Sequence, residues 1–154
     1  MVLTLVATAS RPPQPLFVWN RSASAPRGLY LVSPGQMPEA DGMVAAWLPQ
    51  SLRGLAARRH YLPANVPLVK RAAALEGDIV CAQGAEIRVN GQWVATRRRV
   101  DAGGRSMPVW TGCEKLGEGD LFLLMDASGS FDGRYFGVTR RADLIGKARL
   151  LWPD

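Results

Sequence analysis

A pair of serines and one lysine are the residues of this sequence best suited to chemistry. Ser22 and Ser24 alternate with alanines within residues 20–30, where a proline disfavours a helix. Side chains two residues apart on extended backbone point to the same side, so both hydroxyls can face one site. Lys70 stands among aliphatic residues and alanines, and burial in such surroundings lowers a lysine pKa because it penalises the cation. A neutral amine can take the proton of a serine hydroxyl and activate it as a nucleophile.

The composition limits which other chemistry is available. The chain has 154 residues, 47% of them hydrophobic, which is typical of one folded domain. Its one histidine, His60, lies among arginines, where we expect a surface residue, and its two cysteines add too few ligands for a zinc site. We therefore expect neither a metal nor another cofactor. The net charge of +6 is compatible with nucleic acid, an anionic membrane or a solvated surface.

The elements that must position these residues are mostly short strands. Apolar and alternating runs predict strands within residues 29–32, 43–48, 67–75, 78–83, 86–96, 120–126 and 148–152. Asn90 and Gly91 predict a two-residue hairpin turn within one of these runs. One short helix is expected near residues 50–60, and residues 101–119 are expected to form a long excursion between strands. The pattern predicts a mainly β single domain.

The first 18 residues differ in character from the rest. An apolar run, MVLTLVATAS, precedes RPPQP, and it is too short for a spanning helix, which needs roughly 20 residues. The run also lacks the charged lead of a signal peptide. We expect residues 1–18 to be a leading strand, a disordered end or the remnant of a longer membrane anchor, with the folded domain in residues 19–154.

A third segment completes a pattern with the serines and the lysine. Ser130, Asp132 and Arg134 alternate with other residues in a turn-like stretch near the end of the chain. The joint order of the three segments resembles the type I signal peptidases, serine proteases with a Ser-Lys dyad, and most closely the conjugal-transfer maturation peptidases of the TraF type. Residues 20–30 match their Asn-x-(Ser/Thr)-x-Ser-x-Pro-x-Gly-Leu-Tyr box, residues 69–78 their Val-Lys-Arg segment ending in Gly-Asp, and residues 130–137 their Ser-Phe-Asp-Ser-Arg-Tyr-Phe-Gly box.

The resemblance implies a role for each residue of the candidate site. Ser24 would be the nucleophile, and Lys70 would be its general base and then the acid that protonates the leaving amine. Ser22 would lend its hydroxyl to the oxyanion hole, and Ser130 would orient the lysine amine. These four side chains are the catalytic and orienting residues that we expect.

Asp132 and Arg134 would form a structural ion pair near this site. The sequence departs from the family pattern at two nearby positions. Gly133 stands where the family usually has serine, and Glu76 stands where a proline usually precedes the glycine. Both changes make a turn less rigid, and neither removes a residue with an implied role.

The resemblance also implies a fold and a location. The fold would be a signal-peptidase/LexA-like β domain at the inner membrane, with its catalytic part on the periplasmic side. In a cytosolic chain Cys81 and Cys113 would most often be free core thiols. In the periplasm two cysteines are more often bridged, so we expect a disulfide between them, with Cα atoms about 5–6 Å apart.

The implied function is that of a serine endopeptidase of the signal peptidase type. Its substrate would be a membrane-delivered preprotein with small residues before the cut, and in the TraF-type branch a conjugative pilin precursor. An anionic membrane surface would be a further partner of the basic chain, and no nucleic acid is expected.

Three alternatives stay open. A self-cleaving LexA/UmuD-like regulatory protein resembles the same fold, but it needs an Ala-Gly or Cys-Gly site before the serine, and residues 1–21 contain neither. A nucleic-acid-binding module is favoured by the arginines at 97–99, although such modules usually interleave aromatic residues with basic ones. An inactive homologue would be expected to lack a residue of the dyad, and both are present.

Overall fold

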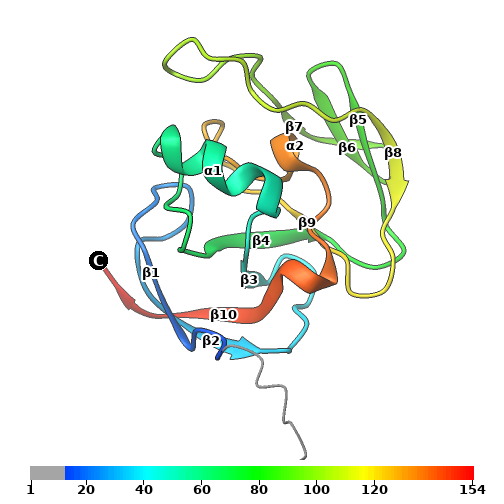
Figure 1. Cartoon of the computed structure of the whole chain (residues 1–154). Helices are drawn as coiled ribbons and strands as arrows, with labels where there is room; N and C mark the ends of the chain where they lie inside the picture. Colours follow the sequence, from blue (N-terminus) through cyan, green and yellow to red (C-terminus); the bar gives the residue numbers. More distant parts are fainter. Residues whose placement is uncertain (1–12) are drawn as a thin grey trace, which may run out of the picture.

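Two antiparallel sheets form the framework of the protein (Figure 1). The computed structural model describes residues 13–154. The strands in that part are β1 (Phe17–Asn20), β2 (Gly28–Pro34), β3 (Met43–Ala46), β4 (Leu68–Ala74), β5 (Ile79–Gln83), β6 (Glu86–Val89), β7 (Gln92–Thr96), β8 (Gly112–Lys115), β9 (Phe122–Leu123) and β10 (Leu144–Pro153). One sheet has the order β1-β2-β10-β3-β4-β9 and the other β7-β6-β5-β8. The predicted mainly β fold is confirmed.

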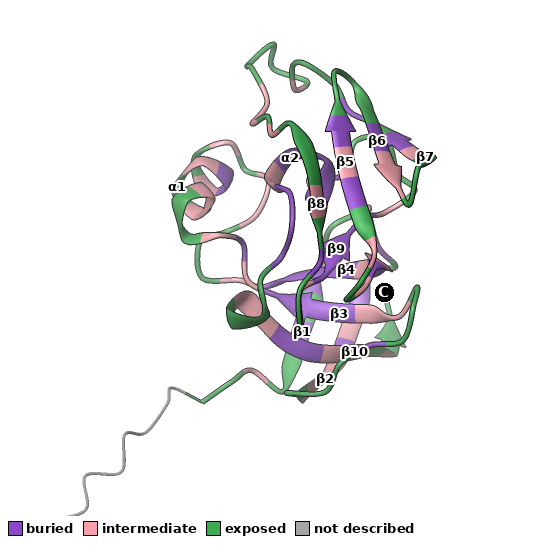
Figure 2. Ribbon diagram, turned by 90° about the vertical axis from the view of Figure 1, so that its right-hand side faces the viewer, coloured by how far each residue is buried: buried purple, intermediate pink, exposed green. Residues whose placement is uncertain are grey.

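The six-stranded sheet has one buried face and one face that is partly open to solvent. Along β1 and β2, Val18, Tyr30 and Val32 are buried, whereas Phe17 and Trp19 point the other way and are exposed. Buried residues dominate the central strands β3 and β4 (Figure 2). Strand β4 is therefore a rigid, apolar support for any polar side chain that it carries.

The predicted hairpin forms one edge of the four-stranded sheet. Asn90 and Gly91 join β6 to β7 with φ angles of 50° and 79°, which is the conformation that a type I′ turn requires. Cys81 on β5 lies opposite Cys113 on β8, and a disulfide joins them with a Cα separation of 4.0 Å. The expected disulfide is therefore present, with a Cα separation shorter than the expected 5–6 Å.

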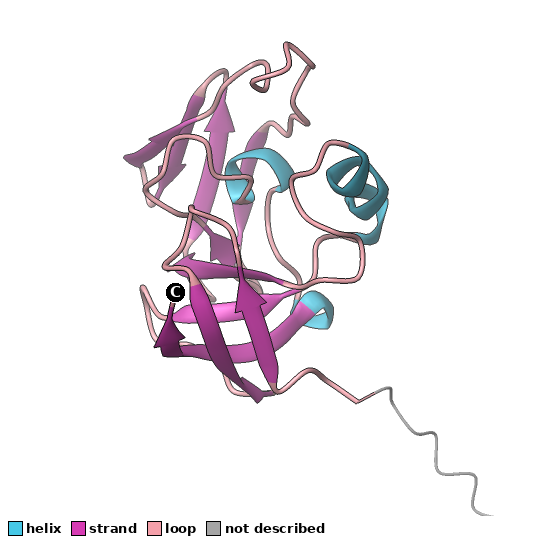
Figure 3. Ribbon diagram, turned by 90° about the vertical axis from the view of Figure 1, so that its left-hand side faces the viewer, coloured by secondary structure: helices cyan, strands magenta, loops and turns pink. Residues whose placement is uncertain are grey.

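The helices are short and support the core (Figure 3). Helix α1, Gln50–Arg58, agrees with the helix expected near residues 50–60, and its buried Ala56 belongs to a core cluster that also contains residues of β3, β4 and β9. A second helix of one turn, α2 (Gly133–Phe136), was not predicted. It begins where the Asp132 carboxylate accepts the backbone N–H of Arg134 at 3.2 Å, and four residues are too few to show helical periodicity. A 3-10 turn, Arg141–Asp143, precedes β10.

The expected N-terminal segment of residues 1–18 lies mostly outside the described residues, which begin at position 13. Strand β1 begins at Phe17, so residues 17 and 18 already belong to the six-stranded sheet. None of the helices within residues 13–154 has the length and apolar character needed to cross a membrane.

Candidate active site

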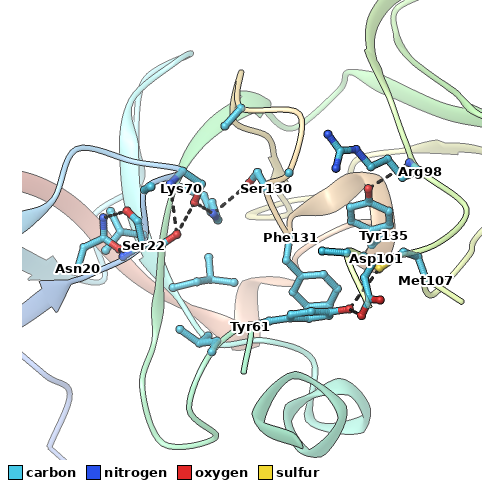
Figure 4. A pocket seen from close by; sticks show the side chains of 18 of the residues that line it. Asn20, Ser22, Tyr61, Lys70, Arg98, Asp101, Met107, Ser130, Phe131 and Tyr135 are labelled. Carbon is cyan, nitrogen blue, oxygen red and sulfur yellow. Dashed lines mark hydrogen bonds between the residues drawn. The ribbon is translucent and has the colours of Figure 1, made fainter. Parts of the chain in front are cut away.

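The loop between β1 and β2 brings Ser24 to the amine of Lys70 on β4. Lys70 Nζ lies 2.5 Å from Ser24 Oγ and also donates to Ser130 Oγ at 3.1 Å. Figure 4 shows the Lys70 side chain between Ser22 on one side and Ser130 on the other. The three segments that the sequence analysis combined therefore meet at one point.

Burial changes the acidity of the Lys70 amine. The residue is 4% exposed and sits on a strand whose flanking residues Leu68, Val69 and Ala72 are also buried. Burial lowers the pKa of Lys70 from 10.5 to about 8; the negative charge of Asp132 opposes this shift and the positive charge of Arg134 adds to it. At pH 7 about one amine in ten is then neutral, compared with about one in 2,500 for an ordinary lysine.

Asp132 and Arg134 form a buried ion pair next to Ser130 in the chain. Arg134 Nε donates to Asp132 Oδ1 at 2.8 Å, and the two side chains are 2% and 0% exposed. The Arg134 guanidinium also donates to the carbonyl of Met125, whose N–H donates to the Asp132 carboxylate. These bonds tie the start of α2 to the segment after β9 and hold the turn that carries Ser130. Removing one partner would leave a buried charge unpaired, at a cost of about 3–5 kcal/mol.

Ser22 lies directly beside Ser24. The two Oγ atoms are 2.7 Å apart, and the backbone N–H of Ser24 donates to Ser22 Oγ at 3.3 Å. The Ser22 hydroxyl, which is the predicted oxyanion donor, and the Ser24 N–H are thus neighbours that bond to each other. A substrate oxyanion of suitable position could accept from both.

A pocket of about 440 Å³ opens beside the serine and lysine side chains. Its wall away from Ser24 and Lys70 is aromatic. There Phe131 lies between Tyr61 and Tyr135, with its ring centroid 5.0 Å from that of Tyr61 and 5.9 Å from that of Tyr135. The Tyr61 hydroxyl donates to the carboxylate of Asp101 and so joins the segment after α1 to the loop before β8. The volume is within the range of small-ligand pockets, so it has room for more than one side chain of an extended substrate.

Three further residues that line this pocket had no predicted role: Asn20, Tyr61 and Asp101. Asn20 belongs to the first matched box, and that membership was the one signal available for it. Tyr61 and Asp101 are 40 positions apart, and a polar pair at that separation leaves no local pattern. Among the described residues no group of three or more His, Cys, Asp or Glu side chains could hold a metal ion.

Comparison with known proteins shows the family of this chain. The profile of the family described as signal peptidase, peptidase S26, matches residues 1–152. The chain belongs to the S26 signal peptidase family. It is therefore a protease of the signal-peptidase type.

Two relatives of this S26 peptidase are both named plasmid transfer protein TraF, from Escherichia coli. Each is 31% identical to it, over 147 and 137 residues, which cover 86% and 81% of this chain and 82% and 76% of the relatives. The crystal structure of a signal peptidase I from Enterococcus faecalis V583 is 20% identical, with a TM-score of 0.39, and the match covers 73% of this chain and 97% of that one.

Proposed function

We propose that this S26 peptidase cleaves preproteins with Ser24 as nucleophile and Lys70 as general base. The observation that carries the proposal is the 2.5 Å contact between Ser24 Oγ and a lysine amine that is 4% exposed. A buried amine is poised to lose its proton near neutral pH, and contact with the hydroxyl is the geometry that a general base needs. Ser130, on the other side of the amine, keeps it oriented toward Ser24.

The reaction proceeds by acyl transfer. Neutral Lys70 takes the proton of Ser24 while Oγ attacks the scissile carbonyl carbon, and the Ser22 hydroxyl and Ser24 N–H stabilise the oxyanion. The C–N bond then breaks as Lys70 gives its proton to the leaving amine, which leaves an ester on Ser24. Water, deprotonated by the same lysine, hydrolyses this ester and regenerates the hydroxyl.

The pH dependence of cleavage tests the role of Lys70. Because the neutral amine is the base, kcat/KM should rise about tenfold per pH unit below the pKa and level off above about 8. The rates are to be measured between pH 5.5 and 10 on a quenched-fluorescence peptide with an Ala-x-Ala sequence before the cut. A flat profile across this range, or a midpoint near the ordinary histidine pKa of about 6.5, would contradict a lysine base.

We propose a membrane-delivered preprotein with small residues before the cut as the substrate, and a conjugative pilin precursor in particular. The TraF name of the two relatives, with matches over most of both chains, supports a role in plasmid transfer. The Cys81–Cys113 disulfide supports the periplasmic side of the inner membrane, since disulfides persist in oxidising compartments. The match to a peptidase family supports proteolysis over nucleic-acid binding.

An anionic membrane surface is the second partner that we propose, and the open face of the six-stranded sheet supports it. Trp19 and Trp152 both pair with Leu29, so the three side chains share one face, where the tryptophans are 47% and 72% exposed. Arg21 and Arg27 are exposed in the loop that joins the same strands and carries Ser24. Tryptophan and arginine together suit the interface of an anionic bilayer.

Replacing Trp19 and Trp152 with serine should weaken membrane binding roughly tenfold, because two large apolar side chains no longer enter the interface. The measurement is co-sedimentation with vesicles of equal parts phosphatidylglycerol and phosphatidylcholine. Trp93→Ser is the matched control, because Trp93 is 58% exposed on β7 of the other sheet. Equal vesicle binding by the double variant and the control would disprove this surface.

A further inference from the structure

The side chain of Asn20 joins several parts of the loop that carries the two serines. Its Nδ2 donates to the carbonyls of Ser22 at 3.1 Å, Ala25 at 3.2 Å and Pro26 at 3.0 Å. Its Oδ1 accepts the backbone N–H of Ser22 at 3.1 Å. One amide group therefore binds the loop at both its beginning and its end.

The position of Asn20 in the sheet makes it a firm attachment for the loop. It is the last residue of β1, is 8% exposed, and pairs with Gly28, the first residue of β2. The strand pairing fixes the backbone of Asn20, while its side chain reaches into the loop of residues 21–27. A buried amide with partners on both its nitrogen and its oxygen has little freedom to move.

This attachment bears on the hydroxyl geometry, because Ser22 and Ser24 lie inside the segment that Asn20 closes. Ser24 Oγ must stay 2.5 Å from Lys70 Nζ, and Ser22 Oγ must stay 2.7 Å from Ser24 Oγ. Both serines are on a loop, and a shift of about 1 Å in a reacting group can cost about a hundredfold in rate. Asn20 makes no hydrogen bond to the Lys70 amine. Its influence on the contact between Ser24 Oγ and Lys70 Nζ therefore passes through the loop backbone.

We propose that Asn20 is the positioning residue of the nucleophile loop: its amide holds Ser22 and Ser24 in place against Lys70. The inference rests on the proposed function for its kinetic consequence, but the structural claim about the loop is independent of it. The amide has two N–H groups for three carbonyls, so it gathers the loop carbonyls on the side of the sheet. A side chain without both a donor and an acceptor cannot bind the loop carbonyls and the Ser22 N–H at the same time.

The test compares three variants on the Ala-x-Ala peptide. Asn20→Ala removes all four hydrogen bonds and should lower kcat about 30- to 100-fold. The effect on KM should be smaller, because Asn20 is one of many residues that line the pocket and the main change is the shift of the reacting group. Asn20→Asp keeps the shape of the side chain but turns a carboxylate oxygen toward three carbonyls, so kcat should fall at least as much. This variant replaces Asn20→Ala in the test if the alanine variant does not fold. Tyr30→Phe is the control, since it removes one hydrogen bond to the Pro26 carbonyl in the same loop and should change kcat less than about threefold.

A crystal structure of Asn20→Ala separates this inference from the proposed function. We expect Ser24 Oγ to lie more than about 3.5 Å from Lys70 Nζ, beyond hydrogen-bond distance. A kcat within threefold of the unmodified enzyme, or a reduced kcat with the Ser24 to Lys70 contact intact, would overturn the positioning role. If Ser24→Ala itself left cleavage intact, the proposed nucleophile would be wrong, and the crystallographic distance would still decide whether Asn20 holds the loop.

Discussion

Replacing Ser24 with alanine should lower kcat/KM for the Ala-x-Ala peptide by at least about ten-thousandfold. The substitution removes the oxygen that forms the acyl-enzyme, and the oxyanion hole and substrate binding alone leave only a small residual rate. The protein should stay folded, because Ser24 lies on a partly exposed loop and no core side chain is lost. The thermal unfolding midpoint checks this, and Ser51→Ala on the exposed side of α1 is the matched control.

Ser22→Ala distinguishes the two serines of the loop. Loss of one oxyanion donor should cost about a hundredfold, much less than loss of the nucleophile. If Ser22→Ala were as inactive as Ser24→Ala, the nucleophile would have been placed two residues too late. A Ser24→Ala protein with more than a tenth of the normal activity would remove Ser24 from the mechanism altogether.

Replacing Lys70 with methionine should reduce kcat/KM to a similar extent, at least about a thousandfold. Methionine has nearly the same length and volume but no basic atom, so Ser24 loses its proton acceptor. The fold should remain, because at neutral pH the substitution also removes a buried cation whose desolvation is unfavourable. The midpoint of thermal unfolding should therefore stay equal or rise, which separates a loss of chemistry from a loss of structure.

Lys70→Arg tests whether charge or basicity is needed. Arginine keeps the positive charge but cannot give up its proton in a protein, so it should be as inactive as methionine. Lys147→Met is the control, because that lysine is on the surface, where its amine lies 2.6 Å from Glu39. Activity of Lys70→Arg within tenfold of the unmodified enzyme would mean that the amine acts as a fixed charge and not as a base.

Local patterns in the sequence predicted the elements that depend on near neighbours. The hairpin at Asn90 and Gly91 has the expected positive φ angles, because the turn type follows from those two residues. Helix α1 lies within residues 50–60, and the strand expected at 67–75 is β4, Leu68–Ala74. In each case periodicity or turn chemistry is enough to select the conformation.

Some elements that depend on distant partners were missed or predicted only in part. Strand β1 has four residues and forms on the edge of β2, and β8, with the sequence GCEK, forms on the edge of β5 inside the expected excursion at 101–119. Strand β10 starts at Leu144, earlier than the predicted residues 148–152, because β2 and β3 both pair with it. Such pairing is decided by the neighbouring strand, which a short window of sequence does not contain.

For the candidate site, the sequence by itself determined which side chains are available: Ser22, Ser24, Lys70 and Ser130, through three matched segments in a fixed order. Only the tertiary structure decided that residues 46 and 60 positions apart meet at one amine, that this amine is buried, and that an aromatic wall encloses the pocket beside it. The same holds for Asn20, whose identity is visible in the sequence but whose four hydrogen bonds are not. The reason is physical: side-chain type is a local property, whereas distance, desolvation and the resulting pKa depend on the order in which the strands pair.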